Sequence, residues 1–248
     1  MSGSEATEEI RDEIRKALLE VELSTSRIEY ASEILSVISN IEDWVAIDSW
    51  LGGGRVEDPK NREGFGSSFA EFRAVSILVS MSAELAEAAV SMARSKRYYA
   101  VGAIVRQLIE CEYLLTWFGS DLDNARKWFE SSPDEVRLSF SPKKMRKLTG
   151  FSNEEYWDHC STGGHPAPSG ARLLEKMDPR RRQWPYSAAE MLIDLGLHLR
   201  RIWRAVDTLL ARHHARYARV RADQREKAEN AWARWHEKDP LVAIFANQ

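Results

Sequence analysis

The side chains most able to do chemistry in this chain are concentrated in one short stretch, Tyr156–Arg172, which reads YWDHCSTGGHPAPSGAR. The stretch contains two histidines, a cysteine, an aspartate, three glycines and two prolines. Imidazole, thiolate and carboxylate groups can bind metal ions or transfer protons. Because glycine and proline at this density interrupt helices and strands, we predict a loop that presents these side chains.

His159, Cys160 and His165 are the candidate metal ligands of this loop, with Glu155 and Asp158 beside them. Zinc sites usually combine two closely spaced pairs of ligands, and the sequence offers no second pair to complement the two histidines. No sequence motif marks Cys160 as a nucleophile either. We therefore predict no metal ion and no other cofactor.

His165 is the most promising single residue, because the glycines at 163 and 164 precede it and Pro166 and Pro168 follow it. Such neighbours hold an imidazole in one backbone geometry, and histidine is a common general acid or base near neutral pH. An equally valid interpretation is a turn whose histidine bonds to the end of a helix. Both interpretations remain open at this point.

A second polar group lies within an apolar segment, residues 97–118, which reads RYYAVGAIVRQLIECEYLLTWF from its first arginine. Arg106 and Glu110 are four positions apart and share one face of a helix, whereas Glu112 lies on a different side. Burying such ions costs several kcal/mol each unless they are paired. The pair is therefore either a structural salt bridge or the polar part of a binding or catalytic site.

Apolar residues at helical spacing predict the elements that must position these groups. We expect a long helix from Ile10 to about Ser49, continuous or broken near Ser24, and helices over 69–95 and 97–118. Shorter helices are expected near 121–131 and 142–149. The segment 187–236 is predicted to form one long helix or two collinear ones.

These elements together predict an all-α multi-helix bundle with long N-terminal and C-terminal helices. We divide the chain into a helical segment (1–50), a Gly-rich loop (51–68), a helical core (69–220) and a helical extension (221–248). The loop lacks the strand and Gly-Lys-Ser/Thr end of a phosphate-binding P-loop.

Charge and composition bound the possible partners. Residues 1–142 carry 15 Lys+Arg and 25 Asp+Glu (net −10), whereas residues 143–248 carry 20 and 13 (net +7). This asymmetry favours contact between the halves or with a second copy of the chain, and it leaves nucleic acid as a possible partner. Residues 200–238 contain 11 Lys+Arg and five Asp+Glu with aromatic residues interspersed, a mixture that suits single-stranded nucleic acid.

The N-terminus is acidic and polar, unlike a signal peptide, and we identify no apolar run of about 20 residues that would cross a membrane. Cys111 and Cys160 are too few for a disulfide framework. We therefore expect a cytoplasmic protein with no membrane span.

Arg106-Gln-Leu-Ile-Glu110 in an apolar helix, followed by Tyr156-Trp157 and Gly164-His165-Pro166, resembles bacterial helical families of unknown function. Part of that wider group is similar to the HEPN-type helical domains of toxin and phage-defence ribonucleases. The resemblance covers roughly residues 70–210. HEPN ribonucleases carry an arginine that is followed, after four to six residues on one helix, by a histidine, and we find no such pair in this chain.

The resemblance implies metal-independent RNA cleavage in a pocket where Arg106, Glu110 and His165 converge. His165 would transfer protons, Arg106 would stabilise the phosphorane charge, and Glu110 would orient one of them. Neighbouring side chains are expected to bind the substrate, namely Tyr156, Trp157, His159 and Arg172. The alternative is a non-catalytic module that dimerises or binds a protein through the seam from Leu192 to Leu209.

Overall fold

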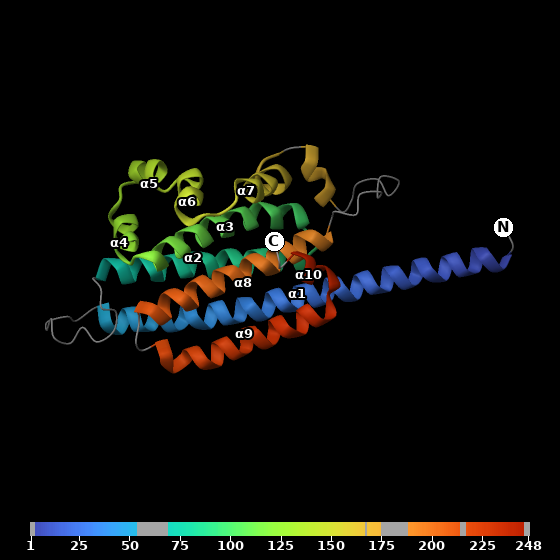
Figure 1. Cartoon of the computed structure of the whole chain (residues 1–248), viewed down its shortest axis with the longest axis horizontal. Coiled ribbons are helices and arrows are strands. Elements are labelled where there is room, and N and C mark those ends of the chain that lie inside the picture. Colours follow the sequence, from blue (N-terminus) through green and yellow to red (C-terminus); the bar gives the residue numbers. More distant parts are fainter. Residues whose placement is uncertain (1–2, 54–68, 167, 175–187, 214–216, 246–248) are drawn as a thin grey trace.

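The computed structural model describes residues 3–53, 69–166, 168–174, 188–213 and 217–245 (Figure 1). Every regular element within these ranges is a helix, and none is a strand. The long elements are α1 (Gly3–Gly53), α2 (Phe69–Arg94), α3 (Tyr98–Ser120), α8 (Ala188–His213) and α9 (Ala218–Lys238). This confirms the predicted all-α bundle. Most of the predicted 51–68 loop lies outside the described residues.

The first helix, α1, is continuous, as the uninterrupted apolar spacing predicts. Its seam residues Ala31, Ile34, Ile38 and Ile41 are each at most 1% exposed and pack against α2, α8 and α9. The N-terminal part of α1 extends past the other helices of the bundle (Figure 1). Among the side chains of α1 that the structure describes, those between Leu23 and Val45 contribute to the core.

The C-terminal segment corrects one prediction, because α8 and α9 are not collinear. The chain reverses between His213 and Ala218, and α9 runs back along α1 (Figure 1). Tyr217, at the start of α9, is fully buried, and Trp235 near its end stacks on Tyr30 of α1 with 4.2 Å between ring centroids. These aromatic rings pack inside the protein, so they are not available to stack on bases.

Short helices cross the outer side of α3 (Figure 1). They are α4 (Asp123–Glu130), α5 (Pro133–Ser139), α6 (Pro142–Thr149), α7 (Asn153–His159), the π-helical turn η2 (Cys160–Gly164) and the 3-10 turn η3 (Pro168–Leu173). The sequence analysis did not predict α5, although Ser132 and Glu135 form a capping box at its start. A further short helix, α10 (Pro240–Phe245), follows α9.

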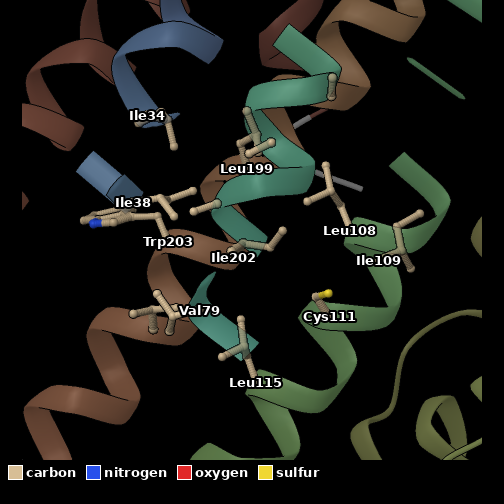
Figure 2. Close-up of a cluster of buried hydrophobic side chains, with 14 of the residues drawn as sticks. Ile34, Ile38, Val79, Leu108, Ile109, Cys111, Leu115, Leu199, Ile202 and Trp203 are labelled. Carbon is tan, nitrogen blue, oxygen red and sulfur yellow. The ribbon is translucent and has the colours of Figure 1, made fainter. Parts of the chain in front are cut away.

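The core lies between four helices, α1, α2, α3 and α8, and α3 also packs against the short helices α6 and α7, as its nearly all-round apolar sequence predicts. Figure 2 shows residues of this core from α1, α2, α3 and α8. They include Ile38, Val79, Leu108, Leu199 and Ile202, each at most 1% exposed. The Leu192–Leu209 seam of α8 is therefore used within the chain, which corrects the suggestion that it forms a dimer surface.

One described helix, α2, has the length and composition to span a membrane, which the sequence analysis did not recognise. Half of its most apolar window is buried, and α2 packs between α1 and α3. Its buried residues include many alanines, such as Ala83, Ala86 and Ala89, which allow close helix approach. The core helix of a soluble protein passes the same test.

A buried ion pair ties the N-terminal helix to the end of α9. Arg27 on α1 donates from Nε to Oδ2 of Asp239 (2.7 Å) and from Nη2 to Oδ1 (3.2 Å), and both side chains are fully buried. Asp239 also accepts a hydrogen bond from the backbone N–H of Leu241, at the start of α10. Charged groups are stable at such depth only when they are paired.

We predict that Arg27→Met lowers the free energy of unfolding by about 3–5 kcal/mol, because it leaves the Asp239 carboxylate buried and unpaired. The matched control is Arg234→Met, which removes an exposed pair with Glu33 between the same two helices and should cost at most about 1 kcal/mol. Denaturant unfolding followed by circular dichroism measures both. Equal losses in the two variants would contradict this account.

Candidate functional site

The helix α7 places most of the residues singled out in the sequence. Ser152 caps it by accepting hydrogen bonds from the backbone N–H groups of Glu154 (3.1 Å) and Glu155 (3.4 Å). The helix lies against α3 and continues directly into the π-helical turn η2. The predicted loop from 156 to 172 is thus wrong for most of its length, because this segment is largely helical. Residues 156–159 lie on α7 and point from different faces of that helix.

Two glycines let η2 approach α3 at backbone distance. A Cβ atom at Gly163 would lie 2.6 Å from the carbonyl carbon and 2.7 Å from the Cα of Gly102. A Cβ atom at Gly102 would in turn lie 3.2 Å from the Cα of Gly163. Only glycine at 163 permits this contact, which fixes where α7 and η2 rest on α3.

Arg106 and Glu110 form the predicted pair on α3, with 3.3 Å between Nη2 and Oε1. Tyr156 on α7 completes the group: its hydroxyl accepts a hydrogen bond from Arg106 Nη2 (3.0 Å) and donates one to Glu110 Oε1 (3.4 Å). The side chains of Arg106 and Glu110 are 28% and 36% exposed. The three residues form one network that solvent can reach, and we call it the Tyr156 centre.

A second arginine belongs to the Tyr156 centre. Arg146 of α6 is buried, its guanidinium carbon lies 4.0 Å from the centroid of the Tyr156 ring, and its Nε donates to Asn153 (3.0 Å). Nη1 of Arg146 and Nε of Arg106 are buried without a hydrogen-bond partner. Two guanidinium groups against the single carboxylate of Glu110 give the centre an excess positive charge.

The pKa values in this centre reflect burial and the two opposite charges. Burial raises the pKa of the Glu110 carboxyl above its ordinary value, and the charge of Arg106 and the Tyr156 hydrogen bond offset part of the rise. Burial also raises the pKa of Tyr156, which the hydrogen bond with Arg106 partly offsets. The hydrogen bond to Tyr156 raises the pKa of Arg106. The tyrosine is therefore a neutral hydroxyl at physiological pH.

His165 lies on the same side of α3 but outside this network. Its backbone carbonyl accepts a hydrogen bond from the Tyr99 hydroxyl (3.3 Å), and its backbone N–H donates one to the backbone carbonyl of Cys160 (3.0 Å). Tyr99 and Arg106 are separated by two helical turns, or about 10 Å. The His165 residue is exposed, and no hydrogen bond or ion pair between described residues joins its imidazole to Arg106 or Glu110.

The residues expected to bind substrate fall into different environments. Trp157 is 61% exposed on α7, beside the buried ring of Tyr156. His159 is buried and belongs to a separate group of charged residues. The backbone of Arg172 lies in η3, but its side chain is outside the described part of the structure.

That separate group lies between α7 and α8. Nε2 of His159 is 2.6 Å from Oδ2 of Asp194, and Nε2 of His198 is 3.5 Å from Oδ1 of the same carboxylate. The side chains of His159 and His198 are 9% and 2% exposed, and their rings meet edge to face with centroids 5.1 Å apart. The two imidazoles thus converge on one aspartate.

Two further carboxylates, one on α3 and one on α7, complete this group. Glu112 of α3, 2% exposed, lies 2.9 Å from Nδ1 of His198. Glu155 of α7 has Oε1 3.8 Å from Nε2 of His198 and is paired with Arg201 of α8. We call these six residues the histidine cluster: Glu112, Glu155, His159, Asp194, His198 and Arg201.

Opposite charges dominate the pKa values of the histidine cluster. Burial lowers the pKa of His198, but hydrogen bonds and charges from Asp194 and Glu112 outweigh it and raise the pKa to about 10. Burial similarly lowers the pKa of His159, and Asp194 raises it above its ordinary value. The two histidines overcome the effect of burial on Asp194, whose pKa is lowered.

The sequence analysis missed Asp194, His198 and Arg201. Asp194 and His198 are four positions apart on α8, as Glu155 and His159 are on α7, so both pairs share a helix face. The apolar periodicity of α8 was assigned to the core, and its two polar interruptions were not compared with those of α7. The repeated acid-x3-His spacing was the signal available.

Comparison of the chain with protein-family models, curated proteins and solved structures gives no match. The class of the protein therefore comes from its own architecture. It is an all-α bundle that carries two polar centres on neighbouring faces of α7.

We predict that Gly163→Ala destabilises the protein by about 1–3 kcal/mol, because the new methyl group would press on the backbone of α3. The matched control is Gly119→Ala, near the end of α3 itself, where no atom outside the adjoining helix backbone lies within 4 Å of the new Cβ. That change should be neutral or stabilise the helix by up to about 1 kcal/mol. Thermal and denaturant unfolding measure both, and a harmless Gly163→Ala would contradict the close contact.

Proposed function

We propose that this protein binds single-stranded RNA on the face formed by α3, α6 and α7 and cleaves it without a metal ion at the scissile phosphate. The observation that carries the proposal is the Tyr156 centre, where two guanidinium groups outnumber the single nearby carboxylate. Guanidinium groups bind phosphate oxygens through paired N–H donors. The HEPN-like resemblance of the sequence points to the same class of substrate.

Neighbouring residues on α6 and α7 supply the other contacts that RNA needs. The sequence of α6, PKKMRKLT, has four basic residues and no acidic one, and Lys143, Lys144 and Lys147 are exposed. Trp157, one residue after Tyr156, presents a large exposed ring. Basic side chains that follow the phosphates and aromatic rings that stack on bases are the usual combination for single strands.

In the proposed reaction the 2′-hydroxyl oxygen of the RNA attacks the adjacent phosphorus, the bond from phosphorus to the 5′-oxygen breaks, and a 2′,3′-cyclic phosphate remains. Arg106 stabilises the extra negative charge on the phosphorane. Glu110 orients Arg106 and Tyr156. His165 takes the 2′-hydroxyl proton or supplies one to the 5′-oxygen, and water transfers the other proton. The imidazole and Arg106 must therefore converge on the same phosphate group when RNA is bound.

Fluorescence anisotropy with a labelled single-stranded RNA tests the binding step. We expect Trp157→Ala to weaken binding by about 5- to 100-fold, because a stacked base contributes about 1–3 kcal/mol. Arg106→Gln should also weaken binding and reduce its salt dependence. The matched control, Arg225→Gln, changes an exposed arginine on α9 and should bind like the wild type.

Gel analysis of the same RNA and of DNA with the same sequence tests cleavage. Wild type should cleave only the RNA, since DNA lacks the attacking 2′-hydroxyl, and His165→Ala should reduce the rate by about 100-fold or more. His236→Ala, an exposed histidine on α9, is the control. Binding without cleavage would remove the enzymatic part of the proposal, and absence of both would end it.

Self-association is a second candidate function, favoured by α1. Its N-terminal part extends past the bundle, and Leu19 and Val21 are 54% and 66% exposed. Leu19 and Val21 are two residues apart and lie on opposite sides of α1, so a helix from a second copy of the chain would pair through one of them.

Analytical ultracentrifugation tests the second candidate. We expect the wild type to form dimers and the double variant Leu19→Glu/Val21→Glu to sediment as a monomer, because charges on the contact oppose helix pairing. Leu138→Glu, at a 61% exposed position of α5, should leave the dimer intact. A wild-type protein that is monomeric at all concentrations would contradict self-association.

A further inference from the structure

The histidine cluster contains an arrangement that its hydrogen bonds alone do not explain. Each imidazole faces an acceptor at both ring nitrogens. His159 has the Glu155 carbonyl oxygen at Nδ1 (2.6 Å) and Asp194 at Nε2 (2.6 Å). His198 has Glu112 at Nδ1 (2.9 Å) and Asp194 at Nε2 (3.5 Å). A neutral imidazole has one N–H, so one nitrogen of each ring needs a further cation, either a proton or a metal ion.

The hydrogen-bond acceptors at the two Nδ1 atoms are of the kind that usually accompany metal-binding histidines. A metal-bound imidazole usually donates its other N–H to a carboxylate or a backbone carbonyl, which fixes the ring and its tautomer. Glu112 fills that position for His198, and the Glu155 carbonyl fills it for His159. Both Nε2 atoms are then free to present their lone pairs toward Asp194.

The ligand atoms are also close enough to share one ion. The ligand atoms of His159, Asp194 and His198 lie within 4.8 Å of one another. In a tetrahedral site with ligand bonds of about 2 Å, neighbouring ligand atoms are separated by roughly 3.3 Å. Binding one ion would therefore move the Asp194 carboxylate back from Nε2 of His159, now 2.6 Å away, and bring the most distant pair of ligand atoms closer together.

We propose that His159, Asp194 and His198 bind one divalent transition-metal ion, with Glu112 as the residue that orients His198. Two imidazole nitrogens with a carboxylate oxygen favour zinc over magnesium or calcium, which prefer oxygen ligands only. Three protein ligands on two helices leave the fourth position of a tetrahedral site to water.

Charge balance supports the same conclusion. Three carboxylates in the cluster, from Glu112, Glu155 and Asp194, face one permanent cation, Arg201. Two further positive charges are needed for neutrality in this largely buried place. One divalent ion between neutral imidazoles supplies both, as protons on the two imidazoles do in the metal-free protein.

The ion would clamp α7 to α8 while Glu112 ties the site to α3. His159 and Tyr156 are three residues apart on α7, so the clamp would also hold the tyrosine against Arg106. This inference does not depend on RNA as the substrate. A metal site without RNA binding, or RNA binding without a metal site, would separate the two proposals.

Isothermal titration of untagged, chelator-treated protein with zinc chloride tests the site, with cobalt(II) absorption as a report on geometry. We expect one zinc ion per chain, a higher melting temperature and the intense visible bands of tetrahedral cobalt. His159→Gln and Asp194→Asn should weaken zinc binding by about 100-fold or more, and Glu112→Gln by about 10- to 100-fold. His236→Gln, at an exposed histidine outside the cluster, should bind zinc like the wild type.

Circular dichroism of each metal-free variant checks that the variant is folded. If a ligand variant fails to fold, Glu112→Gln still tests the site, because it leaves every metal ligand in place. Weaker zinc binding by folded Glu112→Gln together with unchanged binding by His236→Gln supports the site. Wild-type protein that binds no zinc, or a folded His159→Gln that binds it equally well, overturns the proposal.

Discussion

Burial of charge between α3 and α8 is the constraint on which the rest of this structure depends. Glu112 and His198 face each other with 2% of each side chain exposed, so each depends on its protein partners in place of water. A shift of one residue along either helix would move the carboxylate away from the imidazole and leave the charge of Glu112 buried without this partner. Apolar packing allows many registers, whereas this pair selects one of them.

The same constraint reaches both polar centres through α7. That short helix has no large core of its own and is held by Gly163 against Gly102, by Asp194 at His159 and by Arg106 at Tyr156. Its exposed side carries Trp157 and its inner sides carry the two centres. A change in the histidine cluster would therefore be transmitted to the Tyr156 centre by movement of one rigid helical turn.

Much of the fold could be predicted because local periodicity determines it. The helix over 142–149 and the Arg106–Glu110 pair depend only on residues close in sequence. The Arg27–Asp239 pair, the reversal of the chain after His213 and the meeting of α7 with α8 depend on residues far apart. No single-sequence pattern reports which distant helices touch, so the histidine cluster and the position of His165 could not be derived.

The central claim is that the two histidines of the cluster share a metal ion and thereby fix α7. Crystals of the protein grown with zinc, measured on both sides of the zinc absorption edge, test it most directly. The account predicts one strong anomalous peak about 2 Å from Nε2 of His159, Nε2 of His198 and an oxygen of Asp194. A crystal structure in which both imidazoles bond directly to the carboxylates, with no anomalous peak between them, would contradict it.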